Sequence, residues 1–279
     1  MIKKLIATTA MSLTSFVAVA ADLPKRSNAP VPAPAFVNAP LSWAGFYAGV
    51  SVGYVGTKNT IYVVDGDPTY FPDFAGGETM KHKAHSLFGG GEAGFNVQTG
   101  NFVYGVFVSA SGMNGSDKTW SNGACCGTGD DMFTSKLKSV NVIGGRVGYA
   151  FDRALVYVDG GFALAYHQLD LIDANVREDG STSSSSVGSK LVNKWLPGYS
   201  IGAGVEYAIT NNWRLGLNYR YVNFGTTDWN MTTSSYSSNG EYRGEATYLL
   251  KTKGLDAHMI GVSAKYYFGG TSAPVVARY

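Results

Sequence analysis

Cysteine is nearly absent from this sequence. The 279 residues contain only Cys125 and Cys126, which are adjacent. Two cysteines exclude a disulfide framework. In an oxidising compartment they could form a strained vicinal disulfide or link to another chain, but a pair of loop residues without function is the simpler interpretation.

Charge is also scarce. Charged residues make up 15% of the chain and the formal net charge is +2, whereas Gly (36) and Tyr (18) are abundant. The near-neutral balance gives no reason to expect nucleic acid as a partner. No HExxH or P-loop pattern occurs, so neither an enzyme nor a cofactor is expected.

Long apolar runs are missing beyond the N-terminus. Residues 1–20 carry Lys3 and Lys4, then a short apolar run that ends in Ala18-Val19-Ala20. This pattern predicts a signal peptide cleaved near Ala20, and therefore export. Residues 21–42 are rich in Pro and Ala and predict a periplasmic tether. No later run reaches the roughly 18 to 20 apolar residues of a membrane-spanning helix.

Alternation with a period of two dominates residues 43–268. It predicts eight strands, at about 46–54, 87–97, 102–110, 139–149, 155–166, 199–207, 213–221 and 259–268. The connections alternate between tight turns, "QTGN", "FDR" and "ITNN", and polar segments of roughly 25 to 30 residues. Short turns on one side and long loops on the other are typical of an all-β, eight-stranded antiparallel up-and-down transmembrane β-barrel with four long extracellular loops.

One side of each strand suits lipid. A sheet in a bilayer must close on itself so that every backbone polar group is paired. Its outward residues must be apolar, with aromatic residues at both interfaces. The predicted aromatic girdle consists of Tyr54, Tyr149, Tyr166, Tyr199, Tyr207, Trp213, Tyr221, Tyr266 and Phe268.

The other side of the strands carries isolated charges. By parity, the predicted lumen contains Glu92, Arg146, Asp159, Glu206, Arg214, Arg220 and Lys265. Counting back from the hairpins places Arg146 opposite Asp159 and Glu206 near Arg214, within reach of charge pairs. Such a set could line an ion path, but an eight-stranded barrel is just wide enough for side chains to fill it. A polar plug is the preferred interpretation.

Candidate ligand groups are few. His82 and His85 are three residues apart, which on a strand sends them to opposite faces. His167 and His258 lie near predicted loop ends, where haem ligation is conceivable without direct support. Asp65 with Asp67, and Asp130 with Asp131, could hold a divalent cation, although solvated loop acids explain them equally well. No metal site is predicted.

Several segments resemble a known family. "WAGFYAGVSVGY", "GRVGYAFDRALVYVDGGFALAY", "GYSIGAGVEYAITNNWRLGLNYRYVNFG" and "GVSAKYYF" are similar to the small outer-membrane "porin family" barrels of Brucella, Bartonella and rhizobia. These are related in fold to opacity proteins and the OmpA barrel. The resemblance covers Trp43 to Phe268 and is strongest in the last five strands. It implies insertion by the outer-membrane assembly machinery, with the segment that ends in Phe268 similar to the C-terminal insertion signal. Residues 269–279 continue beyond that pattern, so both Phe268 and Tyr279 are candidates for the recognised terminus.

The leading functional hypothesis is a non-enzymatic outer-membrane barrel that contributes to envelope structure and surface interaction. Outer-membrane lipid is its expected partner, and peptidoglycan or surface ligands are further candidates. One alternative is a narrow passive pore for small solutes, which a continuous polar path would favour. Another is a surface receptor for haem or another small ligand, which histidines converging at the extracellular rim would favour.

Overall fold

The computed structural model describes residues 41–65, 77, 79–120, 131–173, 185–187, 190–237 and 241–268. The predicted signal peptide, most of the tether, Cys125 and Cys126, Asp67, Asp130 and the segment after Phe268 lie outside these residues. The strands are β1 (Gly45–Asp65), β2 (Thr79–Thr99), β3 (Phe102–Trp120), β4 (Asp131–Phe151), β5 (Ala154–Asp173), β6 (Ser185–Val187), β7 (Lys190–Ala208), β8 (Trp213–Asn223), β9 (Thr226–Ser237) and β10 (Tyr242–Tyr267).

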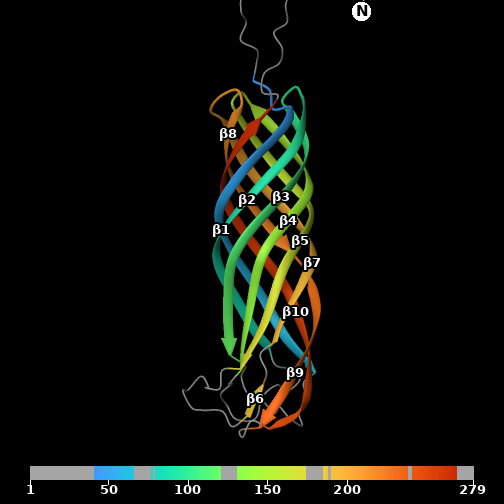
Figure 1. Cartoon of the computed structure of the whole chain (residues 1–279). Helices are drawn as coiled ribbons and strands as arrows, with labels where there is room; N and C mark the ends of the chain where they lie inside the picture. The colour runs from blue at the N-terminus through green and yellow to red at the C-terminus, as the bar shows by residue number, and fades with distance from the viewer. Residues whose placement is uncertain are drawn as a thin grey trace, which may run out of the picture. The chain divides into compact units, whose positions relative to one another are not determined.

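The strands close into a barrel. They follow the order β1-β2-β3-β4-β5-β7-β8-β10, and β10 pairs with β1 to complete the ring. All of these pairings are antiparallel, so the predicted eight-stranded barrel is confirmed. Figure 1 shows the strands tilting around a common axis. None of the described residues forms a helix long and apolar enough to cross a membrane.

The strands extend further than the sequence pattern predicted. β1 runs to Asp65 instead of Tyr54, and β2 begins at Thr79 instead of Leu87. The segment between the last two predicted strands forms β9 and the first half of β10, which pair as a hairpin. β6 pairs with β9, and both lie at the end of the barrel opposite the tight turns (Figure 1). Much of the sequence expected as extracellular loop is therefore β-structure.

The barrel wall has two zones. From the tight turns up to an outer ring that includes Tyr54, Tyr199 and Tyr221, the outward side chains are mostly apolar. Beyond that ring the pattern inverts: Ile61, Phe133 and other inward side chains are apolar and buried, and the outward ones are largely polar. We call the second zone the extracellular extension, because the long connections of such barrels face the exterior. It comprises residues 57–65, 79–84, 113–120, 131–138, 167–173, 190–195 and 224–257.

Candidate functional site

The predicted girdle residues lie on the outward face in two groups. Trp213 and Tyr266 form an edge contact with ring centroids 5.3 Å apart near the tight turns, and Phe268 packs 5.1 Å from Tyr266. Tyr199 and Tyr221 make a similar contact at 6.4 Å at the opposite edge of the apolar zone. The first group is Tyr149, Tyr207, Trp213, Tyr266 and Phe268, and the second is Tyr54, Tyr166, Tyr199 and Tyr221.

Six of the seven predicted lumen charges form one network. Glu92 Oε1 lies 2.6 Å from Lys265 Nζ and 2.8 Å from Arg146 Nη2. Glu206 Oε1 contacts the same two cations, at 2.8 Å and 3.2 Å. Both carboxylates thus share both cations. Asp159 and Arg220 complete the set, with Arg220 Nη2 3.4 Å from Asp159 and 3.7 Å from Glu92. The network holds three acids and three bases, so its formal charges cancel.

Aromatic side chains enclose this network. The Arg146 guanidinium lies over the rings of Tyr157, at 4.3 Å, and Tyr47, at 5.2 Å. The Tyr47 hydroxyl donates to Glu92 Oε1 at 3.1 Å and the Tyr267 hydroxyl to Glu206 Oε2 at 3.0 Å. Aromatic faces attract cations, and hydroxyl donors satisfy carboxylate oxygens that would be costly to leave unpaired. Sequence reasoning overlooked these tyrosines, although their inward parity was readable.

The two charge pairs predicted from hairpin register do not form as ion pairs. Arg146 and Asp159 are cross-strand partners, as expected, but their ion pairs go to other residues across the lumen. Glu206 lies opposite Gly216, and Arg214 lies opposite Ala208. No Glu206–Arg214 ion pair occurs among the described residues, so that predicted pair is wrong. Because the lumen is narrow, long charged side chains reach across the ring. Their ion-pair partners are therefore not determined by hairpin register.

Arg214 instead seals the end of the lumen near the tight turns. Its guanidinium lies 4.9 Å from the ring centres of both Trp43 and Tyr267. Nη1 donates to the carbonyl of Thr210 at 2.7 Å, and Nη2 to that of Ser42 at 3.2 Å. Trp43 is fully buried, and its backbone N–H donates a hydrogen bond to Gln98 Oε1 at 2.8 Å. Residues 41–44 therefore enter the barrel mouth and fill it.

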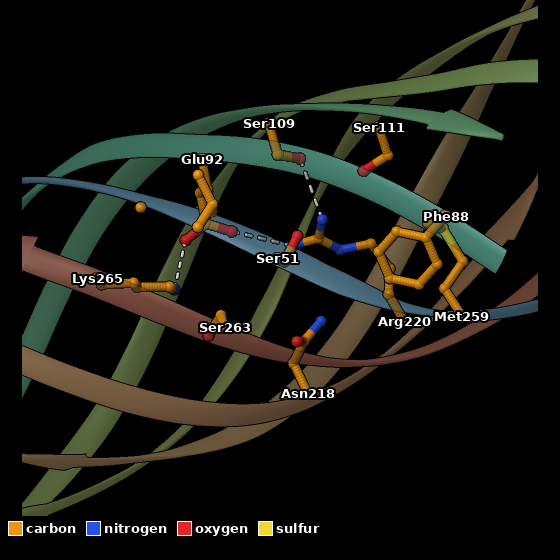
Figure 2. A pocket seen from close by; sticks show the side chains of 12 residues that line it. Ser51, Phe88, Glu92, Ser109, Ser111, Asn218, Arg220, Met259, Ser263 and Lys265 are labelled. Carbon is orange, nitrogen blue, oxygen red and sulfur yellow. Dashed lines mark hydrogen bonds and ion pairs between the residues drawn. The ribbon is translucent and has the colours of Figure 1, made fainter.

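A small polar cavity lies beside the network. Figure 2 shows Arg220 reaching toward Ser109, with Glu92 between Arg220 and Lys265. Ser51, Ser111 and Asn218 also line the cavity, whose volume is about 20 Å³. That is room for one or two water molecules, and too little for a solute.

The four histidines separate into two pairs. His82 and His167 are buried inside the extracellular extension, whereas His85 and His258 are exposed on the outer wall. The predicted opposite facing of His82 and His85 is therefore confirmed. His167 Nε2 lies 2.9 Å from Ser135 Oγ, and its ring packs 5.4 Å from that of Trp229. Among the described residues, no three His, Cys, Asp or Glu side chains gather in a way that could hold a metal.

We expect the extracellular extension to lose stability as the pH falls. Burial, with a smaller effect of His82, lowers the pKa of His167 from 6.5 to about 4. Because the folded-state pKa is the lower one, the stabilisation is complete above the unfolded value and is lost as the pH falls from 6.5 toward 4. The total loss approaches about 3 kcal/mol. Hydrogen exchange of β4, β5 and β9 amides between pH 7 and 4 measures it.

The matched controls are two glutamine variants. His167→Gln should reduce this pH dependence to the part contributed by His82, whose pKa burial also lowers, and His85→Gln, at an exposed position, should keep the wild-type profile. A wild-type profile in His167→Gln would assign the effect to other groups.

Comparisons with known proteins agree with this architecture. The family model described as "Outer membrane protein beta-barrel domain" matches residues 29–268. The 31 kDa outer-membrane immunogenic protein of Brucella melitensis is 32% identical over 218 residues, which are 77% of this chain and 84% of that protein. The 22 kDa outer membrane protein of Rhizobium leguminosarum bv. viciae is 31% identical over 198 residues, 70% of this chain and 71% of that protein. The crystal structure of OprG from Pseudomonas aeruginosa aligns with a TM-score of 0.42 and 11% identity, covering 80% of this chain and 97% of that one.

Proposed function

Because the chain belongs to the outer-membrane β-barrel family that includes the Brucella and Rhizobium proteins, we propose that it is a non-enzymatic barrel with a closed lumen. It resides in the outer membrane of a Gram-negative bacterium. In this role the apolar wall contributes to envelope structure, and the extracellular extension provides the surface for contacts with the exterior.

The observation that carries the proposal is the filling of the lumen at three levels. Trp43 and Arg214 occupy the mouth near the tight turns, the six-residue charge network occupies the middle, and buried apolar side chains such as Leu169 and Met231 fill the extracellular extension. The alternative of a passive pore needs a continuous polar path. The cavity of about 20 Å³ does not supply one.

The receptor alternative needs histidines that converge at the extracellular rim. His82 and His167 face the interior, and His85 and His258 face outward, so this arrangement gives the alternative no support. The Brucella and Rhizobium relatives are outer-membrane proteins. The end of β10 suits recognition by the assembly machinery, because Phe268 is 67% exposed just after the strand.

Conductance in planar bilayers tests the proposal. We expect protein lacking residues 1–20, refolded and inserted, to show no discrete current steps, because the ion pairs and ring contacts close the path. Arg146→Ala and Arg220→Ala each remove part of the filling, and Lys190→Ala, which changes an exposed lysine, is the control for both. Salt-dependent steps in the wild-type protein that change with Arg146→Ala would make the lumen a pore and overturn the proposal. A shift in gel mobility on heating verifies folding in every case.

A further inference from the structure

The outer wall carries an unusual set of basic residues just beyond the apolar zone. Three strands contribute: β2, β1 and β10 lie side by side, with β1 in the centre. Their register aligns the outward residues in rows, and each row shares one height along β1. The first row is Lys81, Thr60 and Lys253, the second is Lys83, Lys58 and Asp256, and the third is His85, Gly56 and His258. We call these nine residues the basic patch.

The lysines of the basic patch have no ion-pair partner among the described residues. Lys58 and Lys83 are direct cross-strand partners, where like charges destabilise a sheet. Both are exposed, as are Lys81 and Lys253. In the described part of the chain none of these four lysines forms an ion pair. The one acid, Asp256, accepts hydrogen bonds from Tyr221 and Asn223 instead.

An apolar groove begins where the basic patch ends. The next row down the same three strands is Leu87, Tyr54 and Ile260. These residues line a groove of about 550 Å³ on the outer wall. It shares Val52, Leu217 and Val262 with a second groove of about 610 Å³ further along β10, β8 and β7. The two make one continuous apolar channel along the lipid-facing surface.

The order of these features indicates the occupant. A ligand that meets cations first and an apolar channel directly beneath them must carry negative charge at one end and hydrocarbon at the other. The basic patch belongs to the extracellular side, so the ligand belongs to the outer leaflet. Lysines attract phosphate as point charges, and each basic residue at an anionic membrane surface contributes about 1 kcal/mol.

We propose that the basic patch and the channel below it form a binding site for a phosphorylated, acylated glycolipid of the outer leaflet, with its phosphates over Lys58 and Lys83. The headgroup relieves the repulsion between the opposed lysines, and one acyl chain crosses the row of Leu87, Tyr54 and Ile260 and continues over Val52 and Val262. The site goes beyond the proposed closed barrel and does not depend on whether the lumen conducts.

Binding of lipid A to the full refolded protein in nanodiscs tests the site. We expect diphosphoryl lipid A to bind at least tenfold more tightly than its dephosphorylated form. In the double variant Lys58→Ser/Lys83→Ser this preference should fall at least tenfold. The control Lys138→Ser/Lys190→Ser removes the same charge from β4 and β7 and should keep the wild-type preference. Heat-dependent gel mobility confirms that each variant is folded.

Three results would overturn the inference. Equal affinity of wild-type protein for the two forms of lipid A would show that the phosphates are not recognised. An equal loss in both double variants would indicate a general charge effect instead of a site. Displacement of lipid A by inorganic phosphate at the same concentration would show that the basic patch binds anions in general and that the acyl chain does not contribute to binding.

Discussion

Glu206→Gln is expected to lower the free energy of unfolding by about 3 to 5 kcal/mol. Glu206 is 1% exposed, and its carboxylate accepts hydrogen bonds from Lys265, Arg146 and Tyr267. Glutamine keeps the shape and removes the charge. Glu92 would then be the one carboxylate left in contact with both Arg146 and Lys265, and one buried cation would lack compensation. Denaturant titration of the refolded barrel in micelles measures the loss.

A double variant separates charge balance from shape. Glu206→Gln leaves two acids with three bases in the network, and adding Lys265→Met restores two of each. The double variant should therefore be more stable than Glu206→Gln alone, by about 1 kcal/mol or more, although it carries one more substitution. Glu245→Gln changes an exposed acid of β10 and should stay within about 0.5 kcal/mol of wild type. Additive losses in the double variant would contradict a shared network.

The lipid-facing part of the wall could be predicted from the sequence, because the alternation of apolar and polar residues depends only on neighbouring positions in each strand. A strand in lipid must alternate, and every second residue must be apolar. The stretch from Ile201 to Tyr221 has this pattern on both sides of "ITNN", and β7 and β8 pair there as the tight turn requires. Residue parity therefore separates outward residues such as Val205 from inward ones such as Glu206, without knowledge of the rest of the chain.

The extracellular extension could not be predicted in the same way, because its pattern is inverted. In "FTSKLKS" the apolar Phe133 and Leu137 face inward, and Lys136 and Lys138 point toward the polar exterior. The pattern of apolar outward residues ends at the aromatic girdle, so the sequence predicts loops for the residues of the extracellular extension. Above the membrane the surroundings are water, so the wall follows the rule of a soluble barrel, with the apolar side inside.

The partners across the lumen were also beyond sequence reasoning. Glu92 and Lys265, which are in contact, are 173 positions apart. Hairpin register relates neighbouring strands, whereas these contacts depend on the height and reach of side chains on strands that are not joined by a turn. The closure of the ring decides which charges meet, and that is a property of the whole barrel.

Gly161→Ala is expected to destabilise the barrel by about 3 kcal/mol or more, the upper part of the range for overpacked sites. Gly161 of β5 lies opposite Gly144 of β4. A Cβ atom on Gly161 would be 2.2 Å from the carbonyl oxygen of Ile143 and 2.6 Å from Gly144 Cα. The obstacle is backbone, which cannot rotate away as a side chain can. Both strands are fixed on their other edges by β3 and β7, so relief requires the ring itself to distort.

Gly112→Ala is the matched control, because a Cβ atom there would have no heavy atom within 4 Å. Its stability should remain within about 0.5 kcal/mol of wild type, as measured by the same denaturant titration. Gly144→Ala should behave like Gly161→Ala, since its Cβ would lie 2.3 Å from the carbonyl oxygen of Gly160. Equal stability of Gly161→Ala and Gly112→Ala would mean that β4 and β5 do not approach this closely. The charge network lies directly beside this contact, two residues along each strand at Arg146 and Asp159, so a wider ring would also loosen the ion pairs that fill the lumen.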